Sequence, residues 1–480
     1  MLVAHNRRCS GTRAVLDEFH RGPTGLGGEH AFGEVALAAA EDQHRAVDLR
    51  RARNDTDRCS HPLTLARQYE APYGWAAIAR FDGVHRPLDV LIAGAGIAGP
   101  ALAYWLNRRG HRPVLVERMD QLRVGGHAVD IRGTALDVID RMDLGDAVRD
   151  ARTRILTLSA VRSDGRSTYD VALRPLHEAH GDREIEIMRD DLVRILFDAI
   201  GSDVEVVFGD AIRSVTQGET SVRVGFDRGP SREFDVVIGA DGQHSALRAL
   251  TFGPERDYAR LLGAYLCIYT VDNLLSLRDQ TMLYNEPGRA AAVFTVRGNA
   301  RAKVVLLFRS GRIGIDNADR RSQCDLLRRR FTGMGWETSR LLDALDGAYD
   351  YYFDEMAQVR MPRWSSGRVA LLGDAAFGPS PLSGQGTSLA LIGAHLLAYQ
   401  LDSALDVATA FDQWENGFRA HVIRNQRLAG DGLAVLLPGS RRGIAMRNQT
   451  MRAMPVLARL GRGFGGRLER ASRSVTLPED

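Results

Sequence analysis

The sequence is poor in lysine and cysteine, and each scarcity excludes a class of site. Lys303 is the only lysine among 63 basic residues, so any mechanism that needs a catalytic lysine must use this one. The four cysteines, Cys9, Cys59, Cys267 and Cys324, are scattered and form no C-x-x-C pair. We therefore expect neither a zinc cluster nor a dithiol redox motif, and free thiols of this kind suit a reducing compartment.

Long apolar runs and a strong excess of one charge are also missing. No apolar stretch reaches the roughly 18 residues of a membrane-spanning helix, and the N-terminus lacks the apolar stretch of a secretory signal. The formal net charge is only +3 over 480 residues, which gives no case for nucleic acid or a membrane surface as a partner. These absences predict a cytoplasmic protein, monomeric or homodimeric, with no metal site.

Residues 1–86 differ from the rest of the chain. They are rich in histidine, arginine and glycine, and they lack sustained helical or strand periodicity. We expect a poorly ordered N-terminal extension here, with a partner-binding arm as the alternative. The folded part is expected to begin near Pro87.

The first informative motif is Gly94-x-Gly96-x-x-Gly99, which follows an apolar run and opens a helical pattern. The first glycine permits a tight turn, the second lets the backbone approach a pyrophosphate, and the third allows close packing of helix and strand. Glu117 ends the next expected strand, where a carboxylate can accept hydrogen bonds from ribose hydroxyls. An acid there disfavours a 2′-phosphate, so this site should hold FAD or NAD rather than NADP.

Two later segments repeat the arrangement of a strand followed by small residues. Residues 234–238 lead into Gly-Ala-Asp-Gly, where Asp241 is either an acceptor for a sugar hydroxyl or a turn residue. Residues 368–372 lead into Gly373-Asp374, at the strand end where ligands of α/β folds bind. Pro381, Gly384 and Gly386 then enter a long helix, whose start offers backbone donors to a flavin carbonyl or a phosphate.

These three segments together resemble the FAD-dependent aromatic-ring hydroxylases, the para-hydroxybenzoate hydroxylase-like family, and especially its tetracycline-inactivating branch. Residues 125–133 resemble that branch's loop beside the flavin, and residues 186–192 resemble its flavin-contacting arginine segment. The chain departs from many members at Phe377, Ser388 and Gly393, where histidine, asparagine and aspartate are common. The resemblance covers residues 88–400 with specific motifs.

The resemblance implies a single-component monooxygenase of secondary metabolism. NADH or NADPH would visit transiently to reduce FAD, and a flavin hydroperoxide would deliver one oxygen atom from O₂ to an aromatic, polyketide or similar small organic substrate. Because the cofactor performs the difficult chemistry, no catalytic dyad or triad is expected. The residues expected to bind FAD are Gly94, Gly96, Gly99, Glu117, Arg118, Asp130, Arg189, Asp241, Gly373, Asp374, Pro381, Gly384 and Gly386.

The expected fold is mixed α/β, with a Rossmann-like FAD-binding domain, an inserted β-sheet substrate domain and a helical C-terminus. We assign residues 87–165, 188–257 and 358–395 to the FAD-binding domain, 166–187 and 258–357 to the substrate domain, and 396–480 to the helical region. The patterns over 135–152 and 388–429 are helical, and Gly430 is the expected stop of the latter. The tail is expected to be helical, with interruptions at Pro438 and Pro455.

The substrate pocket is expected between the flavin and the second sheet, with Tyr284, Phe294, Phe308 and Met356 as candidate lining residues. A flavin-dependent dehydrogenase or reductase is the main alternative function, and a flavin-binding sensor or sequestering protein without turnover is another. Flavin-dependent halogenation is disfavoured because the Trp-x-Trp-x-x-Pro signature is absent.

Overall fold

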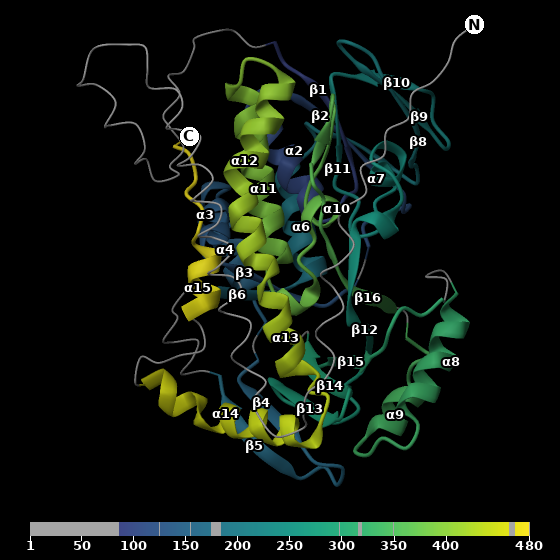
Figure 1. The fold of residues 1–480 in the computed structure, drawn as a ribbon, viewed down its shortest axis with the longest axis vertical. Coiled ribbons are helices and arrows are strands. Elements are labelled where there is room, and N and C mark those ends of the chain that lie inside the picture. Colours follow the sequence, from purple (N-terminus) through teal and green to yellow (C-terminus); the bar gives the residue numbers. More distant parts are fainter. Residues whose placement is uncertain are drawn as a thin grey trace, which may run out of the picture. The chain divides into compact units, whose positions relative to one another are not determined.

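The computed structural model describes residues 86–123, 125–153, 155–173, 184–296, 298–314, 319–348, 350–459 and 466–479. The expected N-terminal extension over 1–86 lies outside these ranges except for its last residue. Within them, the fold is built on two large sheets joined by helices (Figure 1). The expected mixed α/β class is therefore confirmed.

A six-stranded sheet has the order β17-β18-β11-β1-β2-β7. All neighbours in it are parallel except β17 and β18. Its central strands are almost entirely apolar and buried, as strands covered on both faces must be. The strands are β1 (Asp89–Ala93), β2 (Arg112–Glu117), β7 (Glu205–Phe208), β11 (Val236–Gly239), β17 (Ser365–Ser366) and β18 (Val369–Leu371).

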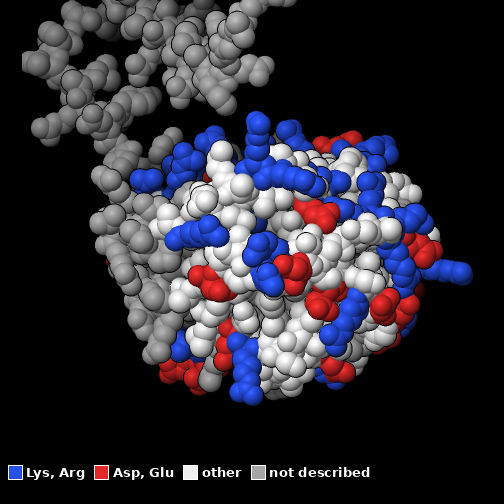
Figure 2. Space-filling model, turned by 90° about the horizontal axis from the view of Figure 1, so that it is seen from below, with Lys and Arg blue, Asp and Glu red and all other residues white. Residues whose placement is uncertain are grey.

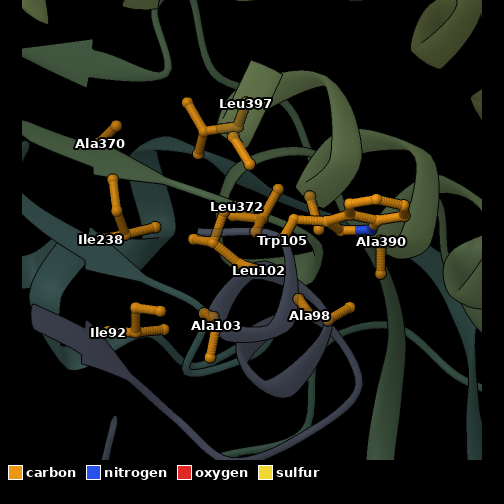
Figure 3. Packing of buried hydrophobic residues seen from close by; sticks show 14 of the residues in the cluster. Ile92, Ala98, Leu102, Ala103, Trp105, Ile238, Ala370, Leu372, Ala390 and Leu397 are labelled. Carbon is orange, nitrogen blue, oxygen red and sulfur yellow. The ribbon is translucent and has the colours of Figure 1, made fainter. Parts of the chain in front are cut away.

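Helices α2 (Ala98–Arg108) and α11 (Gly386–Ser403) pack against each other and against this sheet. In Figure 3, Trp105 of α2 lies beside Ala390 of α11, Leu102 lies beside Leu372, and Ile92, Ile238 and Ala370 come from three adjacent strands. The helix of the first motif and the helix after the third motif thus share one core. A three-stranded sheet, β8 (Ile212–Gln217), β9 (Val222–Phe226) and β10 (Arg232–Phe234), contributes Val222 and Val224 to the same cluster.

The second large sheet has seven strands in the order β16-β12-β15-β14-β13-β4-β5. Neighbours are antiparallel except β13 and β4. Helices α8 (Arg320–Phe331) and α9 (Thr338–Asp343) cover part of it. The strands are β4 (Thr157–Val161), β5 (Ser167–Ala172), β12 (Ala259–Asp272), β13 (Gln280–Glu286), β14 (Arg289–Val296), β15 (Arg301–Arg309) and β16 (Tyr352–Val359).

Two expected domain boundaries differ from the sheets that form. Strand β4 belongs to the seven-stranded sheet, so that sheet begins at Thr157 rather than at residue 166. Strand β6 (Glu184–Met188), expected in the same sheet, instead pairs with β3 (Ala128–Arg132) in a separate two-stranded sheet. Strand pairing explains both differences. Strand β4 of the β4–β5 hairpin pairs with β13, whereas β6 pairs with β3, which directly precedes α3.

The remaining helices refine two expectations. The stretch expected to be helical over 135–152 forms two helices, α3 (Thr134–Arg141) and α4 (Gly145–Asp150), because Asp143 between them has a positive φ of 59°. The long helix after residue 388 is also broken: Asp406 accepts a hydrogen bond from the Thr409 N–H (2.8 Å) and starts a new helix. The others are α6 (Arg189–Ile200), α7 (Ala246–Thr251), α10 (Asp374–Phe377), α12 (Val407–Gln426), α13 (Leu428–Leu436), α14 (Arg441–Arg459) and α15 (Gly466–Ser472), with 3-10 turns η2 (Glu255–Asp257) and η3 (Pro381–Ser383).

Gly430 lies inside α13 and does not end a helix, and α14 runs past position 455. A Cβ added at Gly430 would meet nothing within 4 Å, so no turn requires glycine there. Pro438, by contrast, follows the end of α13, where a proline cannot continue the helix. Helix α11 also crosses the expected boundary at 395/396, because it is one continuous helix.

None of the described helices combines the length and apolar character that crossing a membrane requires. On the face shown in Figure 2, acidic side chains are interspersed with basic ones. This mixing of positive and negative charges on that face agrees with the small net charge of the sequence as a whole.

Candidate active site

One edge of the six-stranded sheet brings the three sequence motifs together. Strands β18, β11, β1 and β2 are adjacent and parallel, so their carboxyl ends lie side by side. Gly94 follows β1, Asp241 follows β11 and Asp374 follows β18, while Glu117 ends β2. This is the edge where α/β sheets bind ligands.

A pocket of about 870 Å³ opens at this edge. Eleven of the thirteen residues expected to bind FAD line it: Gly94, Gly96, Glu117, Arg118, Asp130, Arg189, Asp241, Asp374, Pro381, Gly384 and Gly386. Residues from the seven-stranded sheet and the segment before it form further walls, namely Ile268, Asp350, Tyr351, Tyr352 and Asp354. The pocket therefore lies between the two large sheets.

The two remaining glycines act through packing. A Cβ added at Gly99 would lie 1.9 Å from the carbonyl oxygen of Gly94 and 3.1 Å from a Leu115 methyl group. One added at Gly373 would lie 3.1 Å from the Cβ of Ala98. Both positions thus let α2 approach the turns at the strand ends, as the third glycine of such a motif does.

The turn after β1 needs glycine for a different reason. Gly94 has a φ of +104°, and an added Cβ would lie 2.6 Å from the carbonyl oxygen of Ala240. The Gly94 N–H donates to the Val116 carbonyl at 2.8 Å. The turn is therefore fixed between two neighbouring strand ends, and α2 begins right after it without a side-chain cap. Its free N–H groups are suited to phosphate oxygens.

The Glu117 carboxylate is held beside this turn. It accepts hydrogen bonds from the backbone N–H of Ala95 (2.9 Å) and of Met119 (3.0 Å). Arg118, exposed next to it, also lines the pocket. A carboxylate fixed in this way at the end of β2 can accept hydrogen bonds from a ribose.

Asp241 has partners within its own loop. Its oxygens accept hydrogen bonds from the Ser245 hydroxyl (2.5 Å) and the Leu247 N–H (3.1 Å) at the start of α7. Burial raises the pKa of its carboxyl, and these hydrogen bonds oppose the shift. Of the two roles expected from the sequence, the turn residue is the one these contacts describe.

Asp130 and Asp374 lie at the pocket with raised pKa values. Burial raises the pKa of Asp130 to about 7, against the opposing charge of Arg132, whose Nη1 lies 3.1 Å away. Asp374 faces the open pocket but is enclosed by protein on its other sides, and this burial raises its pKa while Arg189 lowers it. Two carboxyls with raised pKa values thus line the pocket, where they can form hydrogen bonds with polar ligand atoms.

Arg189, at the start of α6, supplies positive charge to the same pocket. The backbone N–H of Arg189 donates to the His127 carbonyl at 3.1 Å, and this hydrogen bond connects α6 to the loop before β3. Burial and then the charges of Arg189, Arg123 and Lys303 lower the pKa of His127 to about 4. His127 is therefore a neutral imidazole in the pocket at physiological pH.

His244 joins the loop after β11 to the seven-stranded sheet. Its Nδ1 lies 3.0 Å from Glu255 Oε1, and its Nε2 lies 3.0 Å from Asp354 Oδ2 on β16. These two carboxylates raise the pKa of His244 to about 10. The charged imidazole therefore bridges the two walls of the pocket.

The arrangement fits a flavin dinucleotide. At Gly96 an added Cβ would meet only Arg189 Nη2, at 3.5 Å, and at Gly242 it would meet nothing within 4 Å, so both backbones are open to the pocket. The volume lies toward the upper end of ligand pockets, ~300–1,000 Å³. Helix starts, glycine turns, an arginine and ribose-binding carboxylates are the groups that FAD requires.

Comparison with known proteins decides the family. A model of the FAD binding domain family matches residues 87–415. The chain belongs to this family. FAD is therefore its cofactor, and the protein is an FAD-dependent monooxygenase.

The relatives include an uncharacterized protein of Mycobacterium tuberculosis, 44% identical over 72% of this chain and 93% of that protein. A flavin-dependent monooxygenase from an unknown prokaryotic organism is 40% identical over 70% of this chain and 87% of that one. The crystal structure of the tetracycline destructase Tet(55) has a TM-score of 0.71 and 36% identity, covering 82% of this chain and 99% of Tet(55).

Two departures from the family pattern are coupled in this monooxygenase. Phe377, where the resemblance led us to expect histidine, packs against Trp364 (4.7 Å between ring centroids) and Phe418 (5.6 Å). A Cβ added at Gly393 would lie 3.2 Å from the Phe377 ring and 3.1 Å from the Phe418 ring. The small residue at 393 therefore gives room to the aromatic cluster. Ser388, the third departure, accepts a hydrogen bond from the Arg132 N–H at 3.1 Å.

The four candidate substrate residues lie away from the pocket, contrary to expectation. Tyr284 is buried with its hydroxyl on Glu286 (2.9 Å), and Phe308 stacks on Tyr265 (5.5 Å) in the core under α8. Met356 packs in another cluster, and Phe294 is half-buried on β14. Tyr284 and Phe308 point into the core under α8, on one face of the sheet. Met356 shares the other face with the pocket residues Tyr352 and Asp354, because alternate residues of a strand point to the same side, but it lies further along β16.

Sequence reasoning missed the pocket residues that come from the second sheet and its approaches. Ile268, Asp350, Tyr351, Tyr352 and Asp354 lie on β12, on β16 or just before β16. The paired tyrosines followed by an acid were a visible signal, but only the pairing of β16 with β12 places them at the pocket.

Proposed function

We propose that this monooxygenase takes electrons from NADPH or NADH and inserts one oxygen atom of O₂ into an aromatic or polyketide-like small molecule. The observation that supports it is the pocket, which continues from the FAD motifs to strands β12 and β16 of the seven-stranded sheet. A second molecule bound against Ile268 and Tyr352 would lie next to the cofactor. Overall, NAD(P)H, a proton, O₂ and a C–H bond yield NAD(P)⁺, a C–OH bond and water.

FAD, when bound, supplies the hydride acceptor and the O₂ activation. The residues of the chain bind and orient the cofactor and shield it from water. The turn at Gly94–Gly96 and Arg189 hold the dinucleotide, and Glu117 fixes its adenosine end. Asp130 and Asp374 offer hydrogen bonds to its polar atoms, and the aromatic walls Tyr351 and Tyr352 exclude water.

The likeness to Tet(55), described as a tetracycline destructase, favours fused-ring polyketides of the tetracycline type as the first substrates to test. Among the residues that the structure describes, one dinucleotide fingerprint is used by FAD, so NAD(P)H would dock transiently. We also propose a cytoplasmic location, where NAD(P)H is available as reductant.

The test is a coupled assay with the FAD-loaded protein. NADPH and NADH oxidation and O₂ uptake are measured with and without tetracyclines, rifamycins and simple phenols, and products are analysed by mass spectrometry under ¹⁸O₂. We expect substrate-stimulated oxidation and a product that carries one labelled oxygen. A product without label would indicate a dehydrogenase or reductase, and bound FAD without stimulated oxidation would indicate a sensor or sequestering protein.

A further inference from the structure

Lys303 and Asp350 form an ion pair that is nearly inaccessible to water, since each side chain is only 4% exposed. Nζ of Lys303 donates to Asp350 Oδ2. The same carboxylate accepts hydrogen bonds from the Thr270 N–H (2.7 Å) and the Thr270 hydroxyl (2.6 Å). A buried pair is stable only with such satisfied geometry, because both charges have lost their hydration.

The pair crosses three neighbouring strands. Lys303 lies on β15 directly opposite Thr270 of β12, and Asp350 lies just before β16, which pairs with the other edge of β12. Arg320 fixes the same segment by donating to the carbonyls of Leu345 (3.3 Å) and Ala348 (2.6 Å). Asp350 is therefore held at a defined place at the end of the second sheet.

That place is directly against the loop beside the flavin pocket. A Cβ added at Gly125 would lie 2.5 Å from Asp350 Oδ2 and 2.6 Å from its Cβ. Gly125 has a φ of +84° and donates its N–H to Asp190 (3.2 Å) on α6. The glycine is thus enclosed between Asp350 on one side and α6 on the other, and the loop continues into His127 and Asp130, which line the pocket.

We infer that the Lys303–Asp350 pair is a positioning element for FAD: it fixes the carboxylate against which the Gly125–His127 loop packs, and so sets where that loop meets the cofactor. Neither side chain of the pair needs to touch FAD to do this. Removing only the amine would leave a buried, unpaired carboxylate that turns toward the pocket and displaces the loop.

The test compares FAD affinity, by quenching of flavin fluorescence, in the full chain and its variants. Lys303→Met should raise the dissociation constant of FAD about tenfold and shift the absorption bands of bound flavin. Lys303→Met combined with Asp350→Asn should restore most of the affinity, because the neutral amide removes the unpaired charge and keeps the Thr270 contacts. Val304→Ala, a buried change on the same strand, is the control for lost stability and should keep the affinity within about twofold.

The inference is overturned if Lys303→Met binds FAD like the wild type, or if the double variant is no better than the single one. If Lys303→Met does not fold, acetic anhydride labelling of the wild type decides instead. Lys303 is the only lysine, so its modification is read directly from one peptide. We expect it to be protected, and Gly125→Ala, which pushes the loop off Asp350, to increase its labelling and weaken FAD binding. Equal labelling in both proteins would contradict the inference.

Discussion

The two sheets that border the pocket contribute to it in different ways. The parallel sheet supplies glycine turns and helix starts at the ends of β1, β11 and β18, together with the acidic side chains that the motifs place there. The antiparallel sheet supplies side chains, such as Ile268 and Tyr352, at positions that no local motif marks. Binding by the backbone requires small residues at fixed spacings along the chain. A wall of side chains depends instead on which strands the fold brings to the pocket.

The largest effect is expected at the backbone wall. Gly94→Ala should lower the free energy of unfolding by at least about 3 kcal/mol, because the position combines a φ of +104° with an added Cβ 2.6 Å from the Ala240 carbonyl. Urea unfolding measures it. Gly430→Ala is the control and should stabilise by about 0.5–1 kcal/mol, since it lies within α13 with open space around it.

Gly96→Ala separates folding from cofactor binding within the same motif. An added Cβ meets only Arg189 Nη2, at 3.5 Å, so the unfolding midpoint should stay near that of the wild type. FAD affinity should nevertheless fall, because the methyl group enters the space where the backbone approaches a pyrophosphate. If this variant bound FAD as tightly as the wild type, the turn at Gly96 would not be the site that binds the pyrophosphate.

This contrast explains what could be predicted from the sequence. The glycines of the first motif and Asp374 were predictable because a turn at a parallel strand end leaves few alternatives to small residues. Tyr284 and Phe308 were mispredicted as pocket residues because aromatic residues on a strand serve core and pocket equally well. Likewise, the domain boundary expected at 165/166 separated β4 from its sheet, since its partner β13 is over a hundred residues away.

The next effect concerns the contact between the two walls. His244→Gln should cost about 2–3 kcal/mol of unfolding free energy at pH 7, because Asp354, with a side chain only 9% exposed, loses its positive partner. The folded-state pKa of about 10 lies above the ordinary value of 6.5. The stabilisation is therefore complete below about pH 6.5 and is lost as the pH rises through about 10.

Urea unfolding of wild type and His244→Gln between pH 6 and 10.5 measures this difference. The gap between the two proteins should be largest near pH 6–6.5 and shrink steadily as the pH rises toward 10. A surface pair, Arg363 with Asp412 (2.6 Å), provides the control: Arg363→Ala should cost no more than about 0.5 kcal/mol. A gap that stays constant up to pH 10.5 would show that packing, not charge, links the walls.

A smaller effect with the opposite sign is expected at Asp130. Its folded-state pKa of about 7 exceeds the ordinary 3.8, so the FAD-free protein should lose stability as the pH rises from about 4 to 7. Asp130→Asn removes this penalty and should be more stable than the wild type by about 2 kcal/mol at pH 8, with no advantage at pH 4. Arg132 keeps its contact with Glu184 in the variant. If the free energy of unfolding changed with pH in the same way in both proteins, Asp130 would not have the raised pKa.

The smallest effect tests the side-chain wall itself. Tyr352→Phe removes a hydroxyl that donates to Asp354 (3.1 Å) at the pocket and should raise the KM for a substrate about threefold, with kcat nearly unchanged. Tyr284→Phe removes a hydroxyl that donates to Glu286 (2.9 Å), away from the pocket, and should leave KM unchanged. Steady-state kinetics of this matched pair therefore asks whether position at the pocket, rather than aromatic character, makes a residue part of the substrate wall. If KM changed in Tyr284→Phe but not in Tyr352→Phe, the substrate would contact the residues predicted from the sequence, such as Tyr284, rather than Tyr352.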